Sequence, residues 1–273
     1  VSIRQLGMMD MNHDFSRAAR PMFAPDRVRP RFRPFKAMRH FRNLIADKED
    51  TSQVFHIFEA LPRRNFRVEA QAFVESDAGR AVMEREPYLP DILDDHERLR
   101  AMPEGSVAHA YCDFMESEGL SAAGLVAEYD RFTGGRRYGD WMEWYANRNR
   151  DTHDLLHVLT GYGRDALGEQ CVLAFTYGQN PAPANLFIAY AGGLNLKKTT
   201  KSDAPMLKAI NEARKLGRAC PRISEQSILD LLAEPLESAR KRLNITPPVY
   251  YQEAHRRLRA RGIDPYDLLA KAA

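Results

Sequence analysis

Cysteine is scarce in this 273-residue chain, and its spacing excludes the usual cysteine-based sites. Cys112, Cys171 and Cys220 lie far apart, and no two of them form a Cys-x-x-Cys pair. An odd number of widely separated cysteines argues against a disulfide framework and against a zinc site built on thiolates. We therefore expect free thiols and a reducing compartment.

We expect neither a secretory leader nor an unbroken membrane-spanning helix in this chain. Asp10 and Asp14 interrupt the apolar residues near the amino terminus, which argues against secretion. The longest stretch without a charged residue or histidine is 27 residues, 170–196, but Pro181 and Pro183 interrupt it. A membrane span needs about 20 mostly apolar residues in one helix. We expect instead two short apolar helices that form a buried hairpin.

Runs of alternating β-branched residues are absent, so few β-strands are expected. Apolar residues recur at helical spacing from about Phe35 onward. Helices are predicted at 50–61, 66–83, 106–117, 120–129, 141–150, 224–243 with a break at Pro235, and 249–261. We predict an all-α fold, a single-domain multi-helix bundle around the buried hairpin. Residues 1–35 are expected to form a basic extended arm, 36–246 the helical domain and 247–273 a basic helical tail.

Charge is nearly balanced over the whole chain but unevenly distributed. Basic residues outnumber acidic ones by ten to three in residues 1–42 and by 16 to nine in residues 197–273, whereas acidic residues lead by 25 to 14 between them. The first basic segment interleaves cations with phenylalanines: Arg27, Arg29, Arg31, Phe32, Arg33, Phe35, Lys36, Arg39, Phe41 and Arg42. A solvated arm and a nucleic-acid surface are competing interpretations. The apolar centre favours anionic lipid headgroups, and we expect no nucleic-acid partner.

The segment richest in chemistry is residues 153–169. His153 and His157 are four residues apart, and Asp154 is three before His157, so on a helix the three share one face. Zinc enzymes place two imidazoles in this way in His-Glu-x-x-His helices. The sequence therefore predicts a metal site on this helix.

Glu169 is the candidate fourth ligand, although it lies twelve residues beyond His157, about 18 Å along one straight helix. Gly161 and Gly163 can end the first helix and let the next fold back, which brings Glu169 to the other three ligands. Two imidazoles and two carboxylates between helices suit zinc, and also iron or manganese. In the alternative, the imidazoles are core or capping groups bonded to Asp151, Asp154 or Asp165.

Arg164 and Asp165 open the second of these helices. Asp165 is expected to stabilise its amino terminus. Arg164 is interpreted either as solvated or paired with Glu169, or as a contact for an anionic group of a substrate. Arg164 and Tyr162 are therefore the candidate substrate-binding residues.

The motif resembles that of a known family. His153-Asp154-x-x-His157, followed by eleven residues and Glu169, is similar to the signature of the Coq-four family of ubiquinone (coenzyme Q) biosynthesis proteins. The resemblance covers residues 40–246, and its further segments are Pro103-Glu104-Gly105-Ser106 with Tyr111 and Phe114-Met115, Gly161-Tyr162-Gly163-Arg164-Asp165, Gly178-Gln179, Glu234-Pro235-Leu236 and Leu243-Asn244-Ile245.

This resemblance implies an all-α fold, a divalent metal usually taken as zinc, and peripheral membrane association with other ubiquinone biosynthesis enzymes. It implies C1 decarboxylation, with or without hydroxylation, of a 4-hydroxy-5-polyprenylbenzoate. The alternative is a non-catalytic scaffold that binds a polyprenylated benzoate or quinone lipid and has a structural metal. A hydrolase is less favoured, because Asp154 and Glu169 both serve as ligands.

The remaining expectations concern the lipid, assembly and location. The apolar residues that could line a tail site, more simply explained as core, are Leu155, Leu156, Leu159, Leu173, Phe175, Leu186, Phe187, Ile188 and Tyr190. We also expect a homo-oligomer. The expected location is the bacterial cytoplasm, on the inner face of the cell membrane, or the matrix side of the mitochondrial inner membrane in a eukaryote.

Overall fold

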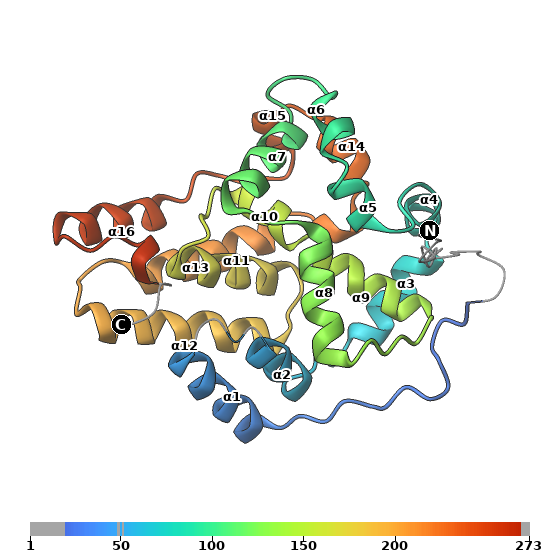
Figure 1. Ribbon diagram of the computed structural model, residues 1–273, viewed down its shortest axis with the longest axis horizontal. Helices are drawn as coiled ribbons and strands as arrows, with labels where there is room; N and C mark the ends of the chain where they lie inside the picture. Colours follow the sequence, from blue (N-terminus) through green and yellow to red (C-terminus); the bar gives the residue numbers. More distant parts are fainter. Residues whose placement is uncertain (1–19, 48–49, 51, 269–273) are drawn as a thin grey trace, which may run out of the picture.

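The computed structural model describes residues 20–47, 50 and 52–268, and helices dominate it (Figure 1). In these ranges the only β-type pairing is an isolated bridge between Ser106 and Pro235. The prediction of an all-α, single-domain fold is confirmed. The helices are α1 (Pro34–Ala46), α2 (Ser52–Ala60), α3 (Phe66–Glu75), α4 (Asp77–Arg85), α5 (Leu89–Leu93), α6 (His96–Arg100), α7 (Val107–Glu118), α8 (Ala122–Thr133), α9 (Trp141–Asp151), α10 (His153–Thr160), α11 (Ala166–Gln179), α12 (Pro183–Thr200), α13 (Met206–Ala219), α14 (Ile228–Ala233), α15 (Leu236–Arg242) and α16 (Val249–Ala260), with short 3-10 turns η1 (Ile223–Glu225) and η2 (Tyr266–Leu268).

Some helix boundaries differ from the predicted ones for local reasons. The predicted helix 66–83 is two helices, because the Ser76 hydroxyl accepts a hydrogen bond from the Gly79 amide at 2.9 Å and begins α4. The helix predicted from Ser224 begins at Ile228, where Ser227 is the cap and Ser224 lies in η1. Helices α5, α6 and α13 were not predicted.

The predicted apolar hairpin consists of α11 and α12, and α11 packs against both α12 and α13 (Figure 1). Helix α13 packs against α11 more extensively than any other pair of helices in the described ranges. Two glycines permit this close approach. A Cβ on Gly217 would lie 2.0 Å from the Phe175 carbonyl oxygen, and one on Gly178 would lie 2.4 Å from the Arg214 carbonyl oxygen.

Gly217→Ala is expected to lower the free energy of unfolding by about 1–3 kcal/mol, because backbone on α11 cannot move aside without separating the two helices. Urea denaturation measures the change. Gly124→Ala in α8 is the matched control. The nearest atom to its added Cβ is the Ser121 side-chain oxygen at 3.1 Å, and alanine favours the helix by up to about 1 kcal/mol. Equal destabilisation by both variants would contradict the packing argument.

Residues 20–33 run as an extended segment along one edge of the molecule to α1 (Figure 1). Asp140 holds this segment to the start of α9. Its buried carboxylate accepts from the Ala24 amide at 2.7 Å, from the Glu143 amide at 2.8 Å and from the Arg27 side chain. Residues 1–19 of the predicted arm lie outside the described residues.

The Asp140 carboxylate links this attachment to pH. Burial alone would raise its pKa, but the bonds from Arg27 and the two amides outweigh burial and lower the pKa. A carboxylate whose pKa is lowered by folding stabilises the protein above its unfolded pKa of about 3.9, and that contribution is lost as the pH falls further.

Asp140→Asn is therefore expected to destabilise the protein by about 2 kcal/mol near pH 7, and by progressively less below about pH 4. Denaturant melts of the wild type and the variant across this pH range measure the difference. Asp77→Asn, at a carboxylate that is 98% exposed, should change stability little at any pH. A difference between wild type and Asp140→Asn that does not vary with pH would contradict the prediction.

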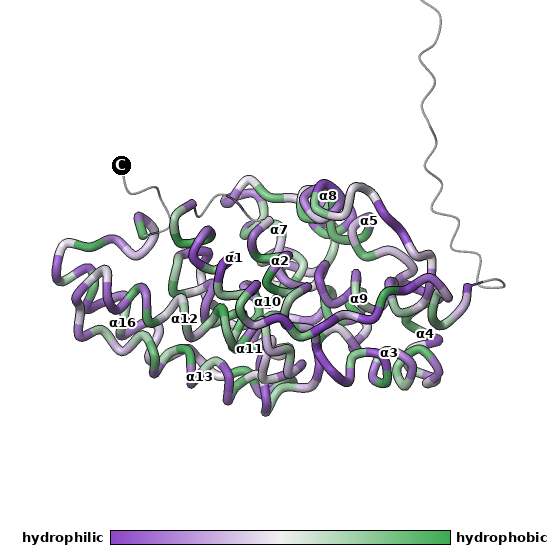
Figure 2. Tube along the Cα trace, turned by 90° about the horizontal axis from the view of Figure 1, so that it is seen from below, coloured by the Kyte–Doolittle hydropathy of each residue, from purple (hydrophilic) through white to green (hydrophobic). Residues whose placement is uncertain are grey.

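The molecule is elongated, with α16 at one end and α3 and α4 at the other (Figures 1 and 2). Helix α16, within the predicted basic tail, packs against α13 and buries Tyr251, Ala254 and Leu258 in the main core. Among the described residues, no helix has both the length and the apolar character that a membrane span requires.

Candidate metal centre

The turn predicted between the two motif helices is present. Helix α10 ends at Gly161, whose φ of +75° is left-handed and whose amide donates to the His157 carbonyl at 2.9 Å. Helix α11 begins after Asp165, whose carboxylate accepts from the Leu167 and Gly168 amides. The prediction that Asp165 stabilises this amino terminus is confirmed.

This turn brings the four predicted ligands together. One donor atom from each of His153, Asp154 and His157 lies within 4.8 Å of the other two. The Glu169 carboxylate lies between the imidazoles, with Oε2 3.6 Å from His153 Nε2 and Oε1 3.6 Å from His157 Nε2. Two imidazoles and two carboxylates therefore gather where α10 meets the first turn of α11.

His157 is the most tightly held of the four. Its Nδ1 donates to the Tyr162 carbonyl oxygen at 3.0 Å, and the Phe114 ring stacks on its imidazole with centroids 5.4 Å apart. This bond leaves Nε2 as the unprotonated nitrogen of the neutral ring. Nε2 is buried and has no hydrogen-bond partner among the described residues. In the neutral ring this nitrogen faces the Glu169 carboxylate, an arrangement that a bound cation would stabilise.

The electrostatics of His157 and Glu169 are coupled. Burial alone would lower the pKa of His157, but the Glu169 carboxylate and the Tyr162 carbonyl outweigh it and raise the pKa. Burial alone would raise the pKa of Glu169, but His157 and His153 hold it well below its usual range. The carboxylate is therefore ionised at neutral pH and available to a cation.

These residues fit a divalent metal. The 3.6 Å separations exceed the 2.7–3.2 Å of an ordinary N–H···O hydrogen bond. They are close to the spacing of about 3.4 Å between two nitrogen or oxygen atoms bound tetrahedrally to one zinc ion. The unpartnered Nε2 and the Nδ1 bond to a carbonyl are the usual features of a metal-binding histidine.

The two predicted substrate-binding residues occupy different environments. Tyr162 is buried, its carbonyl orients His157, and its hydroxyl has no partner within the described ranges. Arg164 is exposed, and it pairs with Glu118 at 3.6 Å rather than with Glu169. Of these two residues, Tyr162 bonds a candidate metal ligand, His157, whereas Arg164 pairs with Glu118.

A second set of residues holds the turn, and sequence patterns did not reveal it. The Tyr251 hydroxyl on α16 accepts from the Gly163 amide at 2.9 Å and donates to the Asp165 carboxylate. His255 Nε2 lies 3.1 Å from the same carboxylate, so Asp165 partners His255 rather than the motif histidines. Tyr251 is 86 residues from Asp165, and no spacing rule connects such positions. The predicted tail therefore helps to shape the candidate metal centre.

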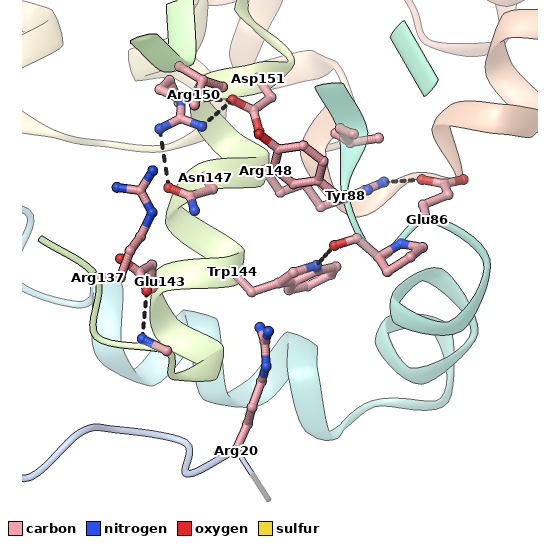
Figure 3. A pocket seen from close by; sticks show the side chains of 14 residues that line it. Arg20, Glu86, Tyr88, Arg137, Glu143, Trp144, Asn147, Arg148, Arg150 and Asp151 are labelled. Atoms are coloured by element: carbon pink, nitrogen blue, oxygen red, sulfur yellow. Dashed lines mark hydrogen bonds and ion pairs between the residues drawn. The ribbon is translucent and has the colours of Figure 1, made fainter. Parts of the chain in front are cut away.

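A separate cavity of about 150 Å³ lies beside α9 (Figure 3). Its charged side chains are largely paired with one another: Arg148 with Glu86, and Arg150 with Asp151. Burial raises the pKa of Asp151 to about 6, although Arg150 opposes the shift. A cavity of this volume can hold a few water molecules or one small ring.

Comparison with known proteins identifies the family to which this arrangement belongs. The family profile described as "Coenzyme Q (ubiquinone) biosynthesis protein Coq4" matches residues 47–249, and this range contains all four predicted ligands. The chain belongs to the Coq4 family. The family assignment suggested by the motif is thereby confirmed, and with it a place among ubiquinone biosynthesis proteins.

Individual Coq4 relatives are distant but align over most of the chain. The chain is 26% identical over 190 residues to the bovine "Ubiquinone biosynthesis protein COQ4 homolog, mitochondrial", covering 70% of this chain and 69% of that protein. The mouse protein of the same name is 26% identical over 170 residues, with 62% and 61% covered. The chain thus spans less than two thirds of the mouse relative.

A solved structure has a similar fold. The crystal structure of a Nostoc punctiforme protein, named for ubiquinone biosynthesis, superposes with a TM-score of 0.57 over 79% of this chain and all of that one. The sequences are 18% identical, so the likeness concerns the fold alone.

Proposed function

We propose that this Coq4-family protein removes the C1 carboxyl group from a 4-hydroxy-5-polyprenylbenzoate during ubiquinone biosynthesis, with a divalent metal, zinc first, at His153, Asp154, His157 and Glu169. The observation that carries the proposal is the unpartnered, buried Nε2 of His157 facing the Glu169 carboxylate. Iron or manganese would suit the same ligands.

The proposed reaction uses the para relation between the phenol and the carboxyl group. A proton adds to ring carbon C1, the phenolic oxygen stabilises the resulting cation, and the C1–carboxyl bond breaks to release carbon dioxide. A divalent metal supplies Lewis acidity, which favours an ionised phenol or orients the carboxylate. The Tyr162 carbonyl keeps the proton of His157 on Nδ1, and Phe114 shields that ring from water.

An apolar groove along α11 and α12 is the proposed site for the polyprenyl tail. It is lined by Tyr177, Pro181, Pro183, Leu186, Phe187, Tyr190, Ala191, Leu194 and Arg214. Tyr177 and Glu169 lie on the same helix, about 12 Å apart along its axis. Gly192 of α12 packs against Gln170, the neighbour of Glu169. The groove therefore lies near the turn between α11 and α12, at the opposite end of α11 from Glu169.

The residues around α1 support peripheral membrane binding. Phe35 is 90% exposed and Phe32 59% exposed, and within the described ranges Arg29, Arg31, Arg39 and Arg42 form no ion pair. Each such cation near an anionic bilayer contributes about 1 kcal/mol of binding free energy. Three of the residues predicted to contact lipid headgroups instead form ion pairs within the protein. Arg27 pairs with Asp140, and Arg33 and Lys36 pair with Glu59.

Phe41 does not join this membrane surface. It is buried, and its ring contacts Phe187 of the groove with centroids 5.3 Å apart. The helix that carries the exposed phenylalanine therefore packs beside the proposed tail site, which gives a lipid substrate a short route from the bilayer.

Phe35→Asp is expected to weaken binding to vesicles that contain anionic phospholipid by about tenfold or more, because it removes an inserting ring and adds a like charge. Vesicle co-sedimentation measures the affinity. Val68→Asp changes another exposed apolar residue, on α3, and should leave vesicle binding unchanged. Equal loss in both variants would contradict a membrane surface at α1.

The reaction is tested by incubating the purified protein with the prenylated hydroxybenzoate and analysing products by mass spectrometry. Simple decarboxylation replaces the carboxyl group with hydrogen. An oxidative version consumes dioxygen and leaves a hydroxyl at C1, so the product mass distinguishes the two. A protein that turns over nothing, yet unfolds and releases its partner enzymes when the metal is chelated, would support the scaffold instead.

A further inference from the structure

A second cluster of metal-binding side chains lies where α6 packs against α7. His96 begins α6, and Cys112 and Glu116 lie one turn apart on α7. One donor atom from each lies within 4.8 Å of the other two. His96 Nδ1 is 3.0 Å from Glu116 Oε1, so two of the three ligands already meet.

The cluster is distinct from the first metal centre although both use α7. Phe114 of α7 stacks on His157, whereas Cys112 and Glu116 converge with His96 of α6. None of the three belongs to the Coq4 signature motif. The spacing of the cysteines in the sequence offered no reason to expect a thiolate ligand, because α6 brings the partner from a separate helix.

The burial pattern suits a cation that enters from the surface. Cys112 is fully buried, while the side chains of His96 and Glu116 are 27% and 53% exposed. The sulfur is thus the buried ligand of the cluster, and the imidazole and carboxylate lie nearer the solvent. The His96 ring is held by an edge-on contact with Tyr111.

We propose that His96, Cys112 and Glu116 bind a second divalent metal ion of the zinc class, with water at the remaining coordination position. Cysteine sulfur, histidine nitrogen and glutamate oxygen are the ligand types that zinc takes in proteins. One thiolate and one carboxylate balance the two positive charges of the ion. The Cys112 proton leaves to solvent, the sulfur lone pair forms the bond to the ion, and no electron is transferred.

The neighbouring charges allow Glu116 to give up its present partner, and Cys112 its proton, so that both bind a metal ion. Arg100 bonds Glu116 at 2.8 Å and Asp113 at 2.7 Å, so it keeps Asp113 when Glu116 turns to the metal. Burial raises the pKa of the Cys112 thiol, although Arg100 opposes the shift, so the sulfur is protonated at neutral pH until a metal displaces the proton.

Cobalt(II) is the probe, because a thiolate bound to it gives a near-ultraviolet charge-transfer absorption that nitrogen and oxygen ligands do not. We expect this absorption when metal-free, full-length protein is titrated with cobalt(II). It should persist in His157→Ala, which removes the first centre, and vanish in Cys112→Ser. Cys171→Ser and Cys220→Ser, at the other buried free thiols, are matched controls that should retain it.

Two surface variants keep the proposal falsifiable if Cys112→Ser does not fold. His96→Asn and Glu116→Gln should each weaken cobalt(II) binding about tenfold or more, since even the loss of a supporting contact at a metal site costs that much. No charge-transfer absorption in folded wild-type protein would overturn the proposal. Absorption that persists in folded Cys112→Ser, or unchanged affinity in both surface variants, would also overturn it.

Discussion

His157→Ala is expected to lower the affinity of the proposed metal centre at His153, Asp154, His157 and Glu169 by at least about 100-fold. The proposed C1 decarboxylation should be lost with the metal. The reason is specific to this side chain. Its Nε2 is the buried atom left without a partner, and its Nδ1 is already bonded to the Tyr162 carbonyl. Removing the ring takes away one of the two imidazoles that face Glu169. Elemental analysis and product formation measured on the same preparation check both expectations.

His56→Ala is the matched control, since it removes an imidazole on α2 that belongs to neither metal cluster. It should keep the metal content of the wild type. Normal metal content in folded His157→Ala would refute the assigned ligands. If His157→Ala loses its metal but still forms product at the wild-type rate, the metal is not needed for the reaction. Decarboxylation would then depend on other residues.

Glu86→Ala is expected to lower the free energy of unfolding by about 3–5 kcal/mol, the usual cost of stranding one member of a buried ion pair. Glu86 is fully buried after α4 and accepts from Arg148 of α9 at 2.7 Å (Figure 3). It also accepts from the Ser227 hydroxyl at 2.7 Å and from the Ile228 and Leu229 amides at the start of α14.

The loss is large because Arg148 is shielded from bulk solvent. Arg148 is 2% exposed, and its other bonds go to the Ser224 and Gln226 carbonyls. Without Glu86 the guanidinium is a buried charge with no counter-ion, and the first amides of α14 lose their acceptor. Guanidinium chloride denaturation at neutral pH measures the change.

Two further variants test the cause. Arg85→Ala removes the adjacent residue, which pairs with Asp230 on the surface, and should change stability little. Glu86→Leu combined with Arg148→Met removes both charges and should recover part of the lost stability. If the double variant is as unstable as Glu86→Ala, the cost arises from the α14 amides and not from the stranded arginine.

Much of the fold followed from local patterns. Helical periodicity located most helices to within a few residues, because a buried stripe repeats every three to four positions whatever it packs against. The misses were α5 and α6, which are single turns, and α13. The split at Ser76 was also missed, because a hydroxyl that caps the next helix competes with continuation of the first one.

The sequence by itself determined the four-residue spacing of His153 and His157, the left-handed end of α10 at Gly161, and hence the meeting of both imidazoles with Glu169. These features depend on helix geometry and on the backbone freedom of glycine, which act over short stretches of chain. Only the tertiary structure decided three other contacts. The Tyr251 hydroxyl bonds the Gly163 amide in the turn, Glu86 pairs with buried Arg148, and His96 lies close to Cys112. Those contacts join residues on different helices, and their approach is set by packing of the whole core, which no local pattern encodes.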